Sequence, residues 1–482
     1  MGRACWVRVP AIGPGMLDFM QEFRRRPARR IVVPSRSDSF LAKSTEVVGG
    51  PLGKHTAPGQ TRTGFFSVER VLVLMVLASG LLALLFKDHC RRAGWVTPDQ
   101  YSTTCYSEFP NAFGTYRIGE VFPFSAANTG FDYPPLTGLI AGVTAWLSGF
   151  AGTGDARVLG FFDLNAFLLV LVWLIGVLAL ARSNRRRPWD AAVFAASPLL
   201  LFTAFSSWDL WAAALSAVAL FLLSRRRAMA SGVVLGLAVS VQPYAGLILL
   251  AAALVLWRRG FRSVLFHLLV GGLLSWLVVN LPVMLLSRPA WFNFWTDAWN
   301  GKPATGSFYY LGNALAERIG VGGIDPVAAS LVSAALLLLG VLGVAVLCFK
   351  TGQTPRLAQL AVLLVGWFLV VDKYAVPEHL VWLLPLFALA RPRWRALLIW
   401  QLFGILFYLA QLLHLGVVLG DNNAQHGIDL PYYALAVLTS NIVTLVMLAL
   451  VVREVLDPRR DLLRRGGVDD PLLDGFTARR LP

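Results

Sequence analysis

Charged residues are scarce in this chain of 482 residues: Asp, Glu, Lys and Arg together make up 15% of it, whereas hydrophobic residues make up 56%. Soluble domains contain about 25% charged residues on average, so the deficit argues against a soluble protein. Apolar stretches such as "VLVLMVLASGLLALLF" recur along the sequence and are long enough for a hydrocarbon core of about 30 Å. The sequence therefore predicts an all-α polytopic membrane protein.

Cysteine is also rare. The chain has four, Cys5, Cys90, Cys105 and Cys348, with no CxxC pair and no His/Cys spacing typical of a zinc site. Cys90 and Cys105 fall in one predicted loop and can form a disulfide if that loop is external. Two free thiols are the alternative that the sequence leaves open.

The net charge of +16 comes from arginines clustered between apolar segments, which is typical of cytoplasmic loops and not of nucleic-acid binding. Fifteen Lys and Arg residues lie in the loops 182–188, 225–227, 258–262, 350–356 and 391–395. One lies in the alternating loops 206–209, 241–244, 372–379 and 420–431. The asymmetry predicts that the first set is cytoplasmic and the second external.

Threading the chain through these loops predicts about twelve spans with both termini cytoplasmic. The spans are 66–86, 159–181, 190–205, 209–224, 228–242, 244–257, 263–284, 326–349, 357–371, 379–390, 396–418 and 432–452. Several are shorter than the roughly 20 residues that an upright helix needs. Residues 228–257 are therefore expected to form a broken, partly re-entrant hairpin that turns at Pro243.

Three regions follow from this threading. Residues 1–64 are rich in Arg, Pro, Gly and Ser without apolar periodicity, and are expected to form a disordered basic cytoplasmic arm. Residues 65–453 form the transmembrane domain. Residues 454–482 form a charged cytoplasmic tail.

Two long external segments, 87–134 and 285–325, interrupt the transmembrane domain and are rich in aromatic residues. Long loops of this kind are usually functional or disordered, and their aromatics suit either an interfacial belt or a binding site. Residues 135–150 are apolar enough to cross, but a crossing there would invert every later arginine cluster. We expect an interfacial or re-entrant helix on the outer face, begun by the prolines of "FDYPPL".

Two acids of the first external segment have unusual neighbours. Glu108 in "CYSEFP" and Asp132 in "GFDYPP" are flanked by aromatic residues and proline. A loop carboxylate is ordinarily a solvated charge, but apolar surroundings raise the pKa of a carboxyl group and suit it to general base catalysis.

Further polar candidates are Asp209 in "SSWDLW", Gln242 in "VQPY", and a cluster in "VDKYAVPEHLVWLLPL" at the outer end of one span. The cluster consists of Asp372, Lys373, Tyr374, Glu378 and His379. Ionisable residues at span ends are often simple flanks, yet ions at the membrane edge are also candidates for function. A lysine there suits a phosphate ligand.

These motifs resemble those of the GT-C superfamily of polyprenyl-phosphate-dependent membrane glycosyltransferases. "CYSEFPNAFGTYRIGEVFPF" looks like their early acidic loop, "DYPPLTGL" follows it into an apolar helix, and "SPLLLFTAFSSWDLW…VSVQPYAGLILL" resembles their central region. "DKYAVPEHLVWLLPLFALA" is similar to the K-x-x-x-P-[QE]-[YH]-x-x-W-L-L-P stretch of the actinobacterial glycosyltransferase family 87. The likeness covers about residues 66–400.

The resemblance implies inverting transfer of a sugar, mannose or a pentose, from a polyprenyl phosphate to a cell-envelope glycan or glycolipid on the external face. It implies a catalytic carboxylate in the first loop, which by position is Glu108, although relatives more usually have aspartate there. Asp132 becomes a supporting or substrate-positioning acid. Gln242 stands where relatives often have a lysine.

The resemblance also implies positive charge for the donor phosphate. Lys373 matches a phosphate ligand, with His379 nearby and Arg117 as a further candidate. No cofactor follows with certainty, because two acids in one loop permit a divalent cation without requiring it.

Two other classes of function fit the span count. A transporter or lipid flippase fits twelve spans, although the halves show no obvious repeat and carriers seldom have a long external loop after the first span. A non-catalytic scaffold for envelope assembly is the third reading, in which Glu108 and Asp132 would be dispensable.

Overall fold

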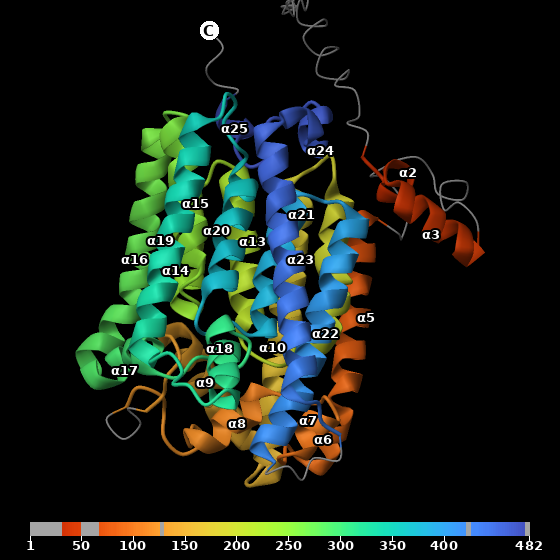
Figure 1. The fold of residues 1–482 in the computed structure, drawn as a ribbon. Helices are drawn as coiled ribbons and strands as arrows, with labels where there is room; N and C mark the ends of the chain where they lie inside the picture. The colour runs from red at the N-terminus through yellow and green to blue at the C-terminus, as the bar shows by residue number, and fades with distance from the viewer. Residues whose placement is uncertain (1–30, 50–66, 126–129, 421–425, 478–482) are drawn as a thin grey trace, which may run out of the picture.

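The computed structural model describes residues 31–49, 67–125, 130–420 and 426–477. Regular structure in this described part is entirely helical, without a strand, which confirms the predicted all-α class. Figure 1 shows a bundle of upright helices with short helices gathered at both ends.

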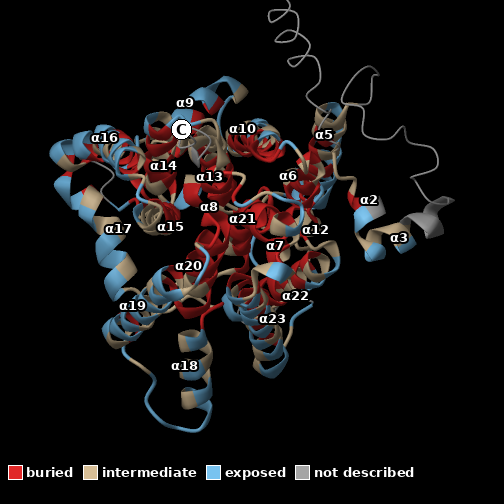
Figure 2. Cartoon of the chain, turned by 90° about the horizontal axis from the view of Figure 1, so that it is seen from above, coloured by how far each residue is buried: buried red, intermediate tan, exposed pale blue. Residues whose placement is uncertain are grey.

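Six helices among the described residues are long and apolar enough to cross a membrane. They are α5 (Val68–Phe86), α10 (Asp155–Ser183), α16 (Arg262–Leu286), α19 (Pro326–Lys350), α22 (Trp394–Leu419) and α23 (Leu430–Leu456). Each coincides with a predicted span. Figure 2 shows that exposed residues gather on the outer faces of α16, α19 and α23, and these faces carry large hydrophobic side chains. Apolar outer surfaces of this kind suit contact with lipid, and the chain is a multi-pass membrane protein.

The other predicted spans are occupied by shorter apolar helices. These are η2 (Pro188–Ala191) with α11 (Ala192–Ala195) and α12 (Pro198–Thr203), α13 (Asp209–Ser224), α14 (Ala228–Val241), α15 (Ala245–Arg258), α20 (Leu357–Val371), and η3 (Pro377–Trp382) with α21 (Leu383–Ala390). Helices of 14 to 16 residues are only about 21–24 Å long, less than the roughly 30 Å hydrocarbon core. The expected break at Pro243 is confirmed, since α14 ends at Val241 and α15 begins at Ala245.

One end of the bundle, here called the loop end, carries the short helices of the two long interruptions (Figure 1). They are α6 (Asp88–Ala93), α7 (Asp99–Ser102), α8 (Glu108–Thr115), α9 (Pro135–Leu147), η1 (Ser148–Ala151), α17 (Arg288–Asn300) and α18 (Phe308–Arg318). The chain reaches this end through α5 and leaves it through α10. Residues 135–151 therefore do not cross the bundle, in keeping with the expected re-entrant or interfacial helix.

The opposite end, here called the tail end, carries the C-terminal elements η4 (Pro458–Arg460), α24 (Leu462–Arg465) and α25 (Asp474–Thr477). Arg356, only 1% exposed, donates to both carboxylate oxygens of Asp461, at 2.7 and 3.0 Å, and to the carbonyl oxygens of Leu389 and Ala390. Asp470 accepts a hydrogen bond from the backbone N–H of Leu357 at 2.9 Å. The described part of the predicted tail is thus docked onto the tail-end termini of α20 and α21.

All five arginine-rich loops meet this C-terminal segment. Their contacts are Arg186 with the Gly466 carbonyl, Arg226 beside Gly475, Arg259 with Asp469, Arg356 with Asp461, and Arg393 with the Arg460 carbonyl. The loops that the charge pattern groups together therefore gather at one end of the fold.

The predicted N-terminal arm lies mostly outside the described residues. Within it, residues 31–49 contain α2 (Pro34–Ser37) and α3 (Ser39–Gly49). Asp38 caps α3 by accepting from the backbone N–H groups of Phe40 and Leu41, and the Ser37 hydroxyl donates to the Val33 carbonyl oxygen.

Close packing of α14 against α16 fixes the position of α14 along the longer helix. A Cβ at Gly232 would lie 2.1 Å from the Leu268 carbonyl oxygen, and one at Gly236 would lie 2.2 Å from the Gly272 carbonyl oxygen. Small residues four positions apart let two membrane helices approach backbone to backbone. The C-terminal end of α14 is thereby held at a fixed depth, where Gln242 follows it.

Candidate active site

A cavity of about 590 Å³ opens at the loop end, where the short helices stop. Its volume is in the range of small-molecule sites. Six carboxylates line it: Glu108, Asp132, Asp209, Asp297, Asp372 and Glu378. The described lining includes no lysine or arginine, so the cavity wall is strongly acidic.

Most of the residues singled out from the sequence meet in this cavity. Glu108, Asp132, Asp209, Gln242, Tyr374 and His379 all line it, although up to about 270 positions separate them in the chain. Lys373 and Arg117 do not line it.

Glu108 is the first residue of α8, and the start of that helix is fastened to the linker between α12 and α13. Ser107 caps the helix and donates to the Phe205 carbonyl oxygen at 2.8 Å, and the Glu108 N–H donates to the Ser206 carbonyl oxygen at 2.8 Å. These backbone contacts fix the position of the carboxylate, which accepts a hydrogen bond from the Tyr133 hydroxyl.

Burial raises the pKa of Glu108 to about 8, while the Tyr133 hydroxyl opposes this rise and nearby carboxylates, Asp209 first among them, add to it. Such a pKa suits a general base, because the group combines appreciable basicity with partial ionisation near neutral pH.

Asp132 has a matching arrangement. Its carboxylate accepts a hydrogen bond from Tyr116, and the Tyr116 and Tyr133 rings meet edge to face with centroids 6.0 Å apart. Burial also raises the pKa of Asp132. Glu108 and Asp132 are thus each paired with a phenol and not with a cation.

Asp209 joins three elements at the cavity floor. Its Oδ1 accepts from Gln242 Nε2 at 2.9 Å and from Trp382 Nε1 at 3.0 Å, and its Oδ2 accepts from the Ser207 hydroxyl at 2.6 Å. With both oxygens engaged by neutral donors, Asp209 holds the α14–α15 turn against η3. The amide group of Gln242 is likewise engaged by the protein, because its Nε2 donates to Asp209.

A stack of rings fixes η3. Trp382 lies between Tyr244 and His379, with ring centroids 4.0 and 4.1 Å away and nearly parallel planes. The Nδ1 atom of His379 is buried without a hydrogen-bond partner. Tyr374 lies on the opposite wall, where its hydroxyl donates to the Asp297 carbonyl oxygen at 2.6 Å.

Lys373 is turned away from the cavity, which argues against the expected phosphate contact. Its ammonium group meets four oxygens: the carbonyls of Trp299 and Gly301 at 2.9 Å, that of Pro326 at 3.4 Å, and the Ser330 hydroxyl at 2.7 Å. The side chain therefore ties the end of α17 to the start of α19.

Arg117 also lies apart from the acids. It is exposed and forms an ion pair with Glu120, three positions along the same loop. The structure thus brings together the predicted acids and His379 but neither of the predicted cations.

The sequence reading missed two partners of the acids and one buried cation. Tyr116 and Tyr133 donate to Asp132 and Glu108, and Tyr133 was visible as the neighbour of Asp132 in "FDYPP". Lys87, the first residue after α5, is 1% exposed. A lysine directly after an apolar span reads as a flank, so no sequence signal distinguished it.

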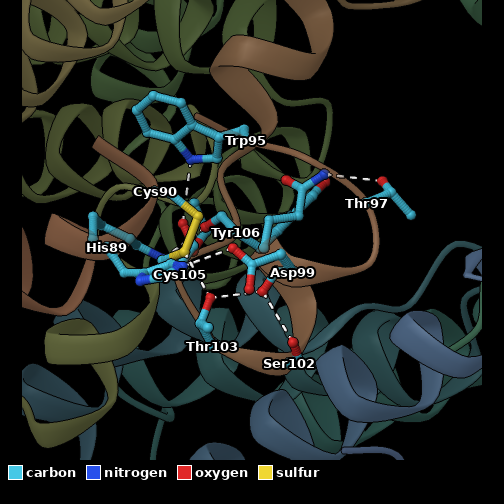
Figure 3. Close-up of a disulfide and its surroundings, with 12 residues drawn as sticks. His89, Cys90, Trp95, Thr97, Asp99, Ser102, Thr103, Cys105 and Tyr106 are labelled. Carbon is cyan, nitrogen blue, oxygen red and sulfur yellow. Dashed lines mark hydrogen bonds and ion pairs between the residues drawn. A yellow bond between two sulfur atoms is a disulfide. The ribbon is translucent and has the colours of Figure 1, made fainter. Parts of the chain in front are cut away.

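The segment that leads to Glu108 is closed by a disulfide between Cys90 and Cys105 (Figure 3). Trp95 Nε1 donates to the Cys105 carbonyl oxygen at 3.3 Å, inside the closed loop. The bridge ends three residues before Glu108, so it restrains the chain immediately before the candidate base.

The described residues contain no group of three or more His, Cys, Asp or Glu side chains arranged to hold a metal ion. The acids of the cavity wall are spread around it and do not converge on one point.

Comparison with known families identifies the chain. A sequence model described as glycosyltransferase family 87 matches residues 131–371, half of the chain. The chain belongs to glycosyltransferase family 87. The matched part begins at the FDYPP segment and includes Asp132, Asp209 and Gln242. The 372–379 cluster begins directly after its end, and Glu108 lies 23 positions before its start. No curated protein matches the chain.

Membership in the family makes this protein a glycosyltransferase with a sugar donor and an acceptor. The resemblance seen in the sequence is thereby confirmed at the level of the family. Since α13 and the α14–α15 turn, which supply Asp209 and Gln242 to the cavity, lie within the matched region, the cavity is the candidate active site.

Proposed function

We propose that this glycosyltransferase moves a sugar, mannose or a pentose, from polyprenyl phosphate to a hydroxyl group of a cell-envelope glycan or glycolipid, with inversion at the anomeric carbon. The observation that carries the proposal is the position of Glu108, a partly ionised carboxylate at a fixed helix start on the wall of an acid-lined cavity. Such a group is suited to take a proton from an attacking hydroxyl.

The proposed step is a single displacement. Glu108 accepts the proton of the acceptor hydroxyl as that oxygen forms a bond to the anomeric carbon. The bond between the anomeric carbon and the phosphate oxygen breaks on the opposite side, and its electron pair leaves with polyprenyl phosphate. Asp132 lines the same cavity and is assigned to orient the sugar, and His379, whose Nδ1 has no hydrogen-bond partner, is assigned to the leaving phosphate.

The same proposal places the cavity on the external face of the membrane. The arginine-rich loops gather at the tail end, and loops of this kind remain cytoplasmic. The disulfide at the loop end supports this orientation, since such bonds persist in oxidising compartments.

The test is a transfer assay with the purified full-length enzyme in lipid nanodiscs, given polyprenyl-phosphate mannose or a polyprenyl-phosphate pentose and an envelope glycolipid acceptor. Replacing Glu108 by Gln removes the base while keeping the side-chain shape, and should lower turnover by about 10³-fold while donor binding persists. Glu120→Gln, an exposed acid in the same loop, is the matched control. Turnover retained by Glu108→Gln would remove Glu108 as the base, and lipid transport without transfer would favour the flippase alternative.

A further inference from the structure

Glu378 is a further buried carboxylate on the cavity wall, and the transfer step above does not use it. It is the second residue of η3, it is 6% exposed, and it lines the cavity. Its Oε2 atom is buried without a hydrogen-bond partner. Buried polar atoms are nearly always satisfied, so an unpartnered carboxylate oxygen on a residue that lines a cavity is a candidate ligand-binding atom.

A buried cation lies behind the same wall. The ammonium of Lys87 donates to the Tyr106 carbonyl oxygen at 2.7 Å, to the Ser206 hydroxyl at 3.1 Å and to the Tyr408 hydroxyl at 3.3 Å. All three acceptors are neutral, and two of them belong to residues that line the cavity. The positive charge is therefore held at the wall without touching an acid.

Lys87 and Glu378 offset each other electrostatically. Burial lowers the pKa of Lys87 to about 7, and the negative charge of Glu378 opposes that fall. The Lys87 ammonium donates its hydrogen bonds to other oxygens, so Oε2 of Glu378 has no partner. Its positive charge nevertheless reduces the free-energy cost of burying the Glu378 carboxylate.

Glu378 is also held rigidly. The next residue, His379, stacks on Trp382, whose indole N–H is bonded to Asp209. The backbone that carries Glu378 is therefore anchored to α13, as a specificity contact requires.

The chemistry of an open carboxylate selects its ligand. It accepts hydrogen bonds from hydroxyl groups, and as an anion it is not a direct ligand for the donor phosphate. Resting on the proposed function, we propose that Glu378 binds hydroxyl groups of a sugar in the cavity, with Lys87 as a positioning residue behind it. That sugar belongs either to the donor or to the acceptor.

The test measures KM for donor and acceptor separately in the full-length enzyme, with Glu378→Gln, Glu378→Ala and Glu378→Asp. Loss of a hydrogen bond to a charged group should raise one KM about 10- to 100-fold. A rise for the donor places its sugar at Glu378, and a rise for the acceptor places the acceptor sugar there. Unchanged KM values, with or without a fall in kcat, would overturn the inference. Glu317→Gln, an exposed acid on α18, is the control.

Lys87→Met should raise the same KM, and the double variant with Glu378→Gln should be less impaired than the product of the two single effects, since both changes act through one contact. Additive effects would contradict the positioning role of Lys87.

A binding measurement separates this inference from the proposed function. Thermal stabilisation of the full-length protein is compared for polyprenyl phosphate and polyprenyl-phosphate mannose. If the sugar adds stabilisation that Glu378→Ala and Glu378→Asp remove, the inference stands even when no acceptor is glycosylated. If transfer occurs but the sugar increment and both KM values survive these changes, Glu378 is not a sugar ligand and the proposed function remains.

Discussion

At the tail end, the buried guanidinium of Arg356 meets a carboxylate and two carbonyl oxygens. At the loop end, Glu108 and Asp132 are paired with phenols, and Glu378 has an oxygen with no partner at all. Both ends bury charge, but among the described residues only the tail end has direct ion pairs in which both side chains are buried. The difference indicates that the tail end is built for stability, while the loop end retains unpaired groups for a ligand.

Breaking the pair at the tail end should have the largest effect on stability. Arg356→Met leaves Asp461 buried and uncompensated, which should lower the free energy of unfolding by about 3–5 kcal/mol. The measurement is the thermal unfolding of the detergent-solubilised protein. Arg356→Met combined with Asp461→Leu should recover part of the loss, and a fully stable single variant would show that the pair is dispensable.

Opening the disulfide should have the next largest effect. Replacing Cys90 and Cys105 by Ser removes a loop closure of 15 residues, which the chain-entropy description values at roughly 3 kcal/mol. Because the loop precedes Glu108, we expect kcat to fall along with the melting temperature. Unaltered kcat at a temperature where the variant is folded would show that the bridge does not position the base.

Replacing Lys373 distinguishes a structural role from a phosphate-binding role for this cation of the loop end. Lys373→Met should cost about 1–3 kcal/mol of stability, because buried carbonyl oxygens of α17 lose their donor. KM for the donor should change less than about 3-fold, since the ammonium points away from the cavity. A large, selective rise in donor KM would restore the phosphate role that the sequence suggested.

The smallest expected effect is a shift in the pH profile. Ionised Glu108 is the active form, so kcat/KM should rise with pH through a pKa of about 8. The titratable groups facing Glu108 are Tyr133, Asp132, Asp209 and Glu378. Asp132→Asn removes one negative neighbour and should move the rise to lower pH by about half a unit. A rise that stays at the same pH in this variant would assign it to another group.

The sequence predicted the parts of this molecule that depend on local pattern. Apolar runs located the helices, Pro243 located the break, and the arginine clusters grouped the loops that meet at the tail end. The acids 108 and 132 were noticed because aromatics and prolines surround them. These signals are local because hydrophobicity and turn chemistry act over a few residues.

Side-chain direction could not be predicted in the same way. Lys373 and His379 lie six positions apart, yet one points at carbonyl oxygens of distant helices and the other lines the cavity. Lys87 opposes Glu378 across almost 300 positions of sequence. Such pairings depend on which helices become neighbours in the fold, and the local sequence around one residue does not reveal this.

The docked C-terminal segment has a consequence for how the protein is made. Arg186 and Arg259 find their partners at Gly466 and Asp469, which leave the ribosome more than 200 residues later. The tail-end termini of the early helices therefore lack these contacts until translation is nearly finished. A chain truncated before residue 457 would insert its helices but lack the contacts that join the arginine-rich loops at the tail end.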